Sequence, residues 1–253
     1  MQKIQQTNET SELSNFWTLR LLSLLKMRHY DLAQKEASDN INFGASESLL
    51  FLCALIPSFC GFHEDSINQL YKFKTSYPMK EKETTLAIAL LLVSMGEYSR
   101  ALKIFHDYGE YSHEIFKLQL LCGNISEAQK ELKNIKDPRD YRVCEGLLLA
   151  SQDNWTECLA VWKSLFLEFP TDSEIANNLA IALVYNGNFT EGLSLLNNFS
   201  SSFKMEFSKN DKMVSNLISL VEMISDKPAD LKFKILESLS GVIDDSFDAS
   251  KFS

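Results

Sequence analysis

One spacing recurs six times along this chain, and it constrains the fold more than any single residue does. In the clearest copy Ala89 is followed seven residues later by Gly96, then by Tyr98, Ala101 and Phe105. Five other copies keep these offsets more or less strictly, and successive copies begin 27 to 35 residues apart. These copies begin at Leu21, Ala54, Phe116, Gly146 and Ala180.

These offsets have a physical cause. Small residues let two antiparallel helices approach each other closely, and a glycine ends the first helix in a left-handed turn. The aromatic residue and the final apolar residue then fill the space inside the hairpin. The period is close to the roughly 34 residues of a tetratricopeptide helix hairpin. The sequence therefore predicts an all-α fold, a tetratricopeptide-like α-solenoid of about six helix hairpins plus C-terminal capping helices.

The same pattern predicts how the chain is organised. Residues 1–12 are polar and are expected to form a disordered N-terminal tail, whereas residues 13–253 should form a single solenoid, because each repeat packs only on its neighbours. Residues 200–208 read as a polar linker before capping helices at about 211–240, and the last of these helices should pack back on the sixth hairpin. The hairpins are expected at about 16–37, 47–74, 81–107, 112–135, 139–169 and 173–199.

Composition narrows the class of partner. The chain is 45% apolar and can bury a large core, and its formal net charge of −9 argues against nucleic acid or an anionic membrane as the main partner. The five cysteines form no CxxC pair, which favours reduced, packed thiols. No apolar run approaches the ~20 residues that span a bilayer, and no secretory signal is evident. We expect a cytoplasmic protein with no direct membrane insertion.

Catalytic motifs are missing from the sequence. It contains neither a GxxxxGK[ST] phosphate loop nor a GxGxxG turn, and the four histidines form no HExxH and share no metal-ligand spacing with the cysteines. We therefore expect no enzyme activity and no catalytic, cofactor-binding or metal-binding residues. Neither a cofactor nor a small-molecule substrate is predicted, and the expected partners are proteins.

An unusual apolar helix suggests where a partner binds. Residues 86–93 are apolar all round, a pattern typical of a helix that is buried on every side. Either the inner helices cover one another, or they form an apolar groove that holds a partner segment. Such a groove would lack the Lys and Asn lining needed to bind carboxylates. The candidate inner positions are Leu22, Leu25, Leu86, Leu90, Val93, Val143, Leu147, Ile181 and Val184.

Three segments carry a resemblance to a known family. Residues 236–247 match the pattern LExxxGxxxDSF, residues 177–187 are similar to NNxAxxLLYxG, and residues 17–33 are similar to an opening hairpin. In these segments the chain resembles the C-terminal repeat region of subunit twelve of the trafficking protein particle (TRAPP) complex. The loop at 38–46 is short for that family, and the long N-terminal extension of some members is absent.

The resemblance implies a function. It implies a non-catalytic scaffold or adaptor subunit of a TRAPP-type vesicle tethering and Rab-activating complex, in ER-to-Golgi or autophagy-related trafficking. Its partners would be large subunits of that complex, which would hold it at Golgi or early secretory membranes. Two alternatives stay open: an epsilon-type coatomer subunit, from which the terminal LExxxGxxxDSF run separates it, and a generic peptide-binding tetratricopeptide adaptor.

Overall fold

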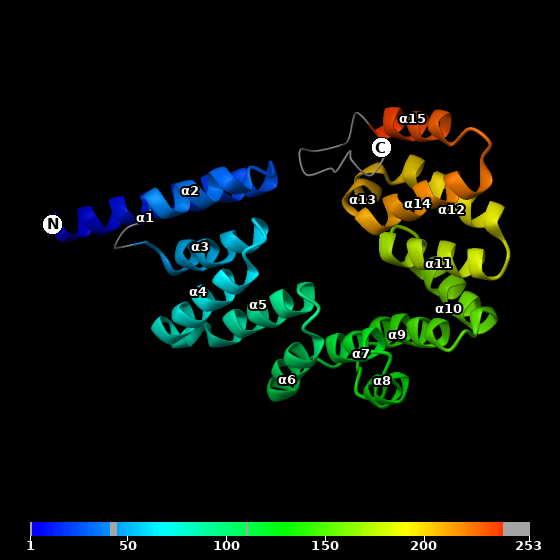
Figure 1. The fold of residues 1–253 in the computed structure, drawn as a ribbon, viewed down its shortest axis with the longest axis horizontal. Coiled ribbons are helices and arrows are strands. Elements are labelled where there is room, and N and C mark those ends of the chain that lie inside the picture. Colours follow the sequence, from blue (N-terminus) through cyan, green and yellow to red (C-terminus); the bar gives the residue numbers. More distant parts are fainter. Residues whose placement is uncertain (1, 41–44, 110, 240–253) are drawn as a thin grey trace. The chain divides into compact units, whose positions relative to one another are not determined.

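The computed structural model describes residues 2–40, 45–109 and 111–239. Helix accounts for 83% of this part of the chain, and no strand occurs in it. The helices follow one another as antiparallel pairs (Figure 1). The predicted all-α solenoid of helix hairpins is therefore confirmed.

The chain divides into two compact units, Met1–Tyr111 and Ser112–Ser253, where the sequence analysis expected one. The division follows Gly109, which ends the third hairpin in a left-handed conformation. Unit 1 contains α1 (Gln2–Lys26), α2 (Tyr30–Asn40), α3 (Glu47–Phe59), α4 (His63–Ser76), a 3-10 turn (Pro78–Lys80), α5 (Glu81–Ser94) and α6 (Tyr98–Tyr108). Unit 2 contains α7 (Ser112–Leu121), α8 (Ile125–Leu132), α9 (Pro138–Ser151), α10 (Trp155–Glu168), α11 (Ser173–Tyr185), α12 (Phe189–Ser202), α13 (Lys204–Lys209), α14 (Asp211–Ile224) and α15 (Pro228–Leu239).

All six hairpins and both capping helices lie where the repeat spacing placed them, but two other segments differ. The prediction of a disordered tail is wrong for residues 2–12, because α1 begins at Gln2 and no glycine or proline interrupts it. The predicted linker at 200–208 is largely helical, since α12 continues to Ser202 and α13 follows. Burial explains α13: its Phe207 is fully shielded from solvent.

The turn inside each hairpin has the predicted left-handed residue. Gly96 has φ of +78°, and the N–H of the next residue, Glu97, donates to the carbonyl of Leu92 at 2.8 Å. This pair of features defines a Schellman turn, which satisfies carbonyls that the end of a helix leaves free. The other five hairpins repeat it, with left-handed residues at Arg28, Gly61, Gly123, Asp153 and Gly187.

The remaining frame positions form the core of the hairpins. Ala101 and Cys158, at the position where the two helices cross, are fully buried. Phe105 and Trp162, which end the frame in the third and fifth hairpins, are each 1% exposed. The assignment of these large side chains to hairpin cores is confirmed.

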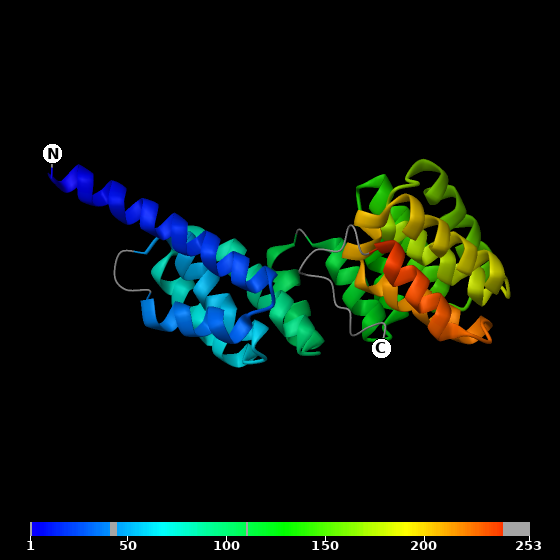
Figure 2. The same ribbon diagram turned by 90° about the horizontal axis from the view of Figure 1, so that it is seen from above.

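The last helix closes unit 2. Leu239 is fully buried and Ile235 is 9% exposed, in a core cluster that also contains residues of the sixth hairpin such as Ala180 and Leu196. The two helices α14 and α15 lie side by side in both views (Figures 1 and 2). Phe233 is 67% exposed and takes no part in this contact. Thus α15 packs on α14 and shares a core cluster with the sixth hairpin, through a narrower stripe of residues than expected.

Candidate protein-binding groove

Unit 2 contains a groove of about 560 Å³ between helices that are distant in sequence. Its walls come from α7, α9 and α11, the first helices of the fourth, fifth and sixth hairpins, and from the start of α14 (Figure 1). We refer to it as the unit-2 groove. It is lined by Lys117, Leu120, Leu121, Leu147, Glu174, Asn177, Asn178, Asn210 and Lys212.

One wall of the groove is apolar. Leu120 and Leu121 end α7, and Leu147 reaches the groove from α9. Leu121 is 61% exposed, so its side chain is open to a partner, whereas Leu147 also packs against two core clusters. This wall can receive apolar side chains of a bound segment.

Amide side chains also line the groove. Asn177 is 7% exposed, and its Oδ1 accepts a hydrogen bond from Nδ2 of Asn216 at 2.7 Å. Asn210 caps α14 by accepting from the N–H of Met213 at 3.0 Å. Asn178 lies beside Asn177 on α11. Nδ2 of Asn177 also donates to Oδ1 of Asn178 at 3.5 Å, and Nδ2 of Asn210 donates to Oγ of Ser173 at 3.1 Å, so these amides mainly fix the helices that line the groove.

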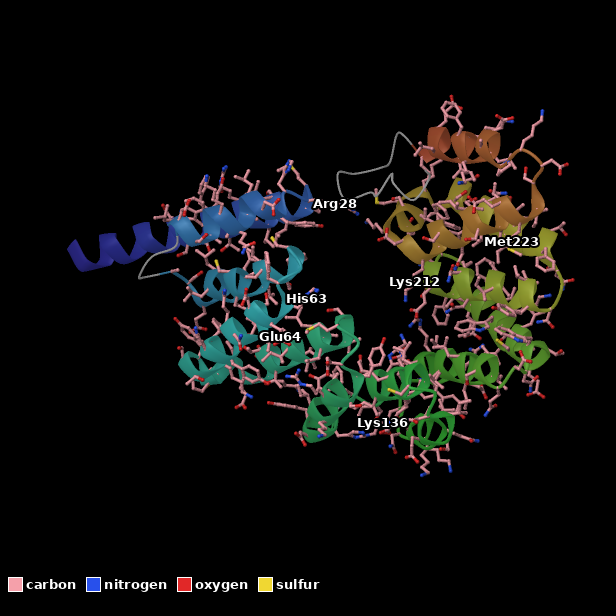
Figure 3. The ribbon with its side chains drawn as sticks, in the orientation of Figure 1. Arg28, His63, Glu64, Lys136, Lys212 and Met223 are labelled. Atoms are coloured by element: carbon pink, nitrogen blue, oxygen red, sulfur yellow. The ribbon has the colours of Figure 1, made fainter. Side chains whose placement is uncertain are left out.

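The charged side chains of the groove differ in whether an opposite charge lies close to them. Nζ of Lys117 lies 3.5 Å from Oε1 of Glu174, so these two charges offset each other. Lys212 follows the N-cap of α14 beside α11 (Figure 3), and no carboxylate in the described part of the chain lies within ion-pair distance of its Nζ. Among the described residues, Lys212 thus has no ion-pair partner, although the neighbouring Asp211 is also exposed.

A second hollow of about 370 Å³ shares two lining residues with the groove. Asn177 and Lys212 line both hollows, and Asp211, Ser215 and Asn216 complete the second one. Asp211 has an interaction of its own within the protein. Lys212 therefore contributes to both hollows.

The nine predicted inner residues are divided between the two units of the chain. Leu22, Leu25, Leu86, Leu90 and Val93 belong to unit 1, and Val143, Leu147, Ile181 and Val184 belong to unit 2. Of these, Leu147 lines the unit-2 groove, and Leu22 and Leu90 are 46% and 54% exposed on their own helices. Leu25, Leu86, Val93, Ile181 and Val184 are half-buried.

Two of these expectations are wrong. Val143 is 1% exposed because it packs inside the cluster of Trp162 and Ile175, so it cannot line a groove. The helix α5 is not buried on all sides, since Leu90 faces solvent. The predicted apolar groove lacks Lys and Asn, whereas two lysines and three asparagines line the groove in unit 2, which shares Leu147 with the predicted positions.

Several lining residues were missed by the sequence analysis, although some carried a signal. Lys117 stands one residue after Phe116, as Leu147 stands one after Gly146, so both occupy the same position of the repeat. Asn177 occupies the repeat position of Val143. By contrast, Asn210 and Lys212 come from a helix outside the repeats, and only the folded chain brings them to the groove.

The described residues offer no sign of catalytic chemistry. No group of three or more His, Cys, Asp or Glu side chains among them could hold a metal ion. Burial raises the pKa of Cys53 to about 11 and that of Cys144 to about 12, which keeps both thiols protonated at neutral pH. None of the helices in this part of the chain is both long enough and apolar enough to cross a membrane.

Solved structures share this fold. A tetratricopeptide repeat protein from Parabacteroides merdae is 15% identical, with a TM-score of 0.56 over 95% of this chain and 100% of its own. The Cut9–Hcn1 hetero-tetramer of the APC/C is 11% identical, with a TM-score of 0.55 over 95% of this chain and 52% of its own. No family model and no curated protein sequence matches the chain. At such low identity the likeness concerns the fold alone, a tetratricopeptide-type solenoid.

Proposed function

We propose that this protein is a non-catalytic scaffold that holds a segment of a partner protein in the unit-2 groove. The observation that carries the proposal is the lining of the groove: three leucines, of which Leu121 is exposed, together with asparagine side chains and a lysine that has no ion-pair partner among the described residues. Exposed apolar side chains beside hydrogen-bonding groups are the usual chemistry of peptide recognition. Helical-repeat proteins use such inner surfaces to bind other proteins.

The more specific part of the proposal is that the partner belongs to a TRAPP-type tethering complex. It is supported by the similarity of residues 177–187 and 236–247 to that family's repeat region. Asn177 and Asn178 of the first run line the groove, whereas Ala180 and Leu183 of the same run are core residues. Residues 240–247 of the second run lie outside the described residues. On this proposal the protein is cytoplasmic and reaches Golgi or early secretory membranes through the complex.

Identifying the proteins that bind this chain in cells tests the proposal. Affinity purification of the tagged protein from its own cells, followed by mass spectrometry, should recover large subunits of a tethering complex. Recovery of coatomer subunits would instead support the epsilon-type alternative, and an unrelated set of partners would support a generic adaptor. In every case the purified chain should neither hydrolyse GTP nor accelerate nucleotide exchange on a Rab protein.

A matched pair of variants tests the groove itself. Leu121→Ser changes a 61% exposed leucine of the groove wall, and Leu167→Ser changes an 84% exposed leucine of α10 that does not line the groove. Both variants should melt like the wild type, because neither side chain is in the core. We expect Leu121→Ser to lose the partner and Leu167→Ser to keep it. Equal recovery by all three proteins would overturn the assignment of function to this groove.

A further inference from the structure

We infer that this protein forms a symmetric dimer in which the outer face of α1 packs antiparallel against the same face of a second copy. The interface lies in unit 1 and does not involve the unit-2 groove, so it goes beyond the proposed function. Three observations lead to it: the exposed apolar residues of this face, their order along the helix, and the length of α1.

The face of α1 that points away from α2 and α3 exposes large apolar side chains. On its inner face α1 buries Leu21 completely, in a core cluster that includes residues of α2 and α3. The helical period places Phe16 and Leu19 on the opposite side, where they are 61% and 67% exposed. Leu13 and Leu22 flank them and are 57% and 46% exposed. Apolar side chains gathered on one exposed face mark an interaction surface.

The order of residues along this face identifies a second copy of the chain as its occupant. In the sequence, the positions on the face alternate in steps of three and four residues, the spacing of two helices that pack side by side. They are Glu9, Glu12, Phe16, Leu19, Ser23 and Lys26.

This order is complementary to its own reverse. In an antiparallel pair, Phe16 lies opposite the partner's Leu19, and Glu9 lies opposite the partner's Lys26. A two-fold axis repeats both contacts, so one face supplies both halves of the interface. A parallel pair would instead bring like charges together at positions 9 and 26, which is unfavourable. The face therefore fits an antiparallel second copy.

The length of α1 indicates how stable the dimer can be. The helix contains 25 residues, whereas α2 and α3 contain 11 and 13, and its N-terminal part extends beyond both of them (Figures 1 and 2). The paired stretch from residue 9 to residue 26 would be about 27 Å long. A contact of one such helix on another buries less than the roughly 800 Å² per partner of a standard interface. We therefore expect a reversible dimer with a dissociation constant of about 10 μM.

Dimerisation would bring two copies of unit 2 into one particle. Two linked grooves can hold a partner with two binding segments more tightly than one groove holds a single segment. Only this consequence rests on the proposed function, because the dimer itself depends on α1 alone.

Sedimentation equilibrium of the full-length protein at about 1 to 200 μM tests the inference, since this range brackets the expected dissociation constant. The wild type should convert from monomer to dimer as its concentration rises. Leu19→Ser should weaken dimerisation about tenfold or more, because each dimer loses two leucines from the seam. Leu167→Ser, at an 84% exposed position on α10, is the matched control and should dimerise like the wild type.

Exchanging the charges at the two ends of the seam provides the decisive comparison. Lys26→Glu should weaken the dimer about threefold or more, because the introduced carboxylate meets Glu9 of the other copy twice in each dimer. Adding Glu9→Lys to the same chain should restore dimerisation, since opposite charges then meet again. In a parallel pair neither change would matter, because like charges would face each other throughout. Failure of the second substitution to restore the dimer would overturn the antiparallel arrangement.

Two other results would also overturn the inference. A wild-type protein that stays monomeric over the whole range would show that α1 does not pair with a second copy. A Leu19→Ser protein that melts at a lower temperature than the wild type at about 1 μM, where monomers predominate, would show that its own chain covers this face. Leu121→Ser should dimerise normally whether or not it keeps its cellular partner, so failure of the groove proposal and failure of the dimer are distinguishable.

Discussion

The indole of Trp162 on α10 lies directly against Gly146 on α9. A Cβ atom placed on Gly146 would come within 2.7 Å of Cε2 of Trp162, closer than packed atoms can lie. Both residues belong to the fifth hairpin, in which Gly146 begins the repeat frame and Trp162 ends it. Trp162 is the largest side chain that ends a frame, and it fits because Gly146, which begins the same frame, has no side chain.

Gly146→Ala should therefore destabilise the protein. We expect a loss of about 1–3 kcal/mol in the free energy of unfolding, because Trp162 is 1% exposed and has little room to move. Urea unfolding followed by circular dichroism measures this loss. In a Trp162→Leu background the same substitution should cost much less, since the overlapping ring is gone. Strictly additive effects of the two substitutions would contradict the contact.

A second prediction concerns the left-handed turns. Gly96 has φ of +78°, and nothing lies within 4 Å of the position that a Cβ would take. Gly96→Ala should thus cost about 1 kcal/mol through backbone strain alone, without any clash. Gly96→Asn should cost less, because asparagine adopts this conformation more readily. Thermal unfolding of the two variants tests this order, and an alanine variant as stable as wild type would exclude a strained turn.

Substitution of two apolar residues on the capping helix α15 should affect stability very differently. Leu239→Ala should lower the free energy of unfolding by about 2–5 kcal/mol, because Leu239 is fully buried in the core of unit 2. Phe233→Ala on the same helix should change it by less than about 0.5 kcal/mol, since Phe233 is 67% exposed. Chemical denaturation of both variants measures the difference. If the two were equally stable, α15 would not be a cap.

Local features made most of the fold predictable from sequence. A Schellman turn needs only one residue that tolerates positive φ and a helix before it, so the frame located these turns even where Arg28 and Asp153 replace glycine. The helix α13 was missed because its formation depends on burial of Phe207 in the core of unit 2, where α13 packs on α12 and α14, and no repeat pattern records this burial.

The candidate site was less predictable, for a related reason. Repeat position predicts that Leu147 faces inward, and Leu147 lines the unit-2 groove. It failed for Val143, which is buried in the core cluster that also contains Trp162 and Ile175. Lys212 belongs to no repeat, and its place beside Asn177 follows only from the packing of α14 on α11.

Alkaline pH should weaken the fold through the buried thiols. Burial raises the pKa of Cys144 from its ordinary value of 9.0 to about 12. Above pH 9 the unfolded chain therefore loses this proton before the folded chain does, and the stabilisation present below pH 9 is lost progressively as the pH rises toward 12. Urea unfolding at pH 7 and about pH 10.5 should show a smaller alkaline loss for Cys144→Ala than for the wild type. Cys122→Ala, at an exposed position, is the control and should keep the full loss.

The last prediction separates two leucines that the repeat frame treats as equivalent. Leu90 and Leu147 occupy the same repeat position, but Leu90 is 54% exposed, whereas Leu147 packs against the clusters that contain Val143 and Cys144. Leu90→Glu should leave the melting temperature nearly unchanged, because the new carboxylate stays in water.

By contrast, Leu147→Glu should lower the free energy of unfolding by roughly 2–5 kcal/mol, because a charge there loses part of its hydration and the apolar contacts are lost with it. Thermal melting of each single variant tests this difference. Loss of partner binding by Leu147→Glu must therefore be judged beside its stability, and Leu121→Ser is the cleaner probe of the groove. A Leu147→Glu protein that melts like the wild type would mean that Leu147 faces the groove without supporting the core.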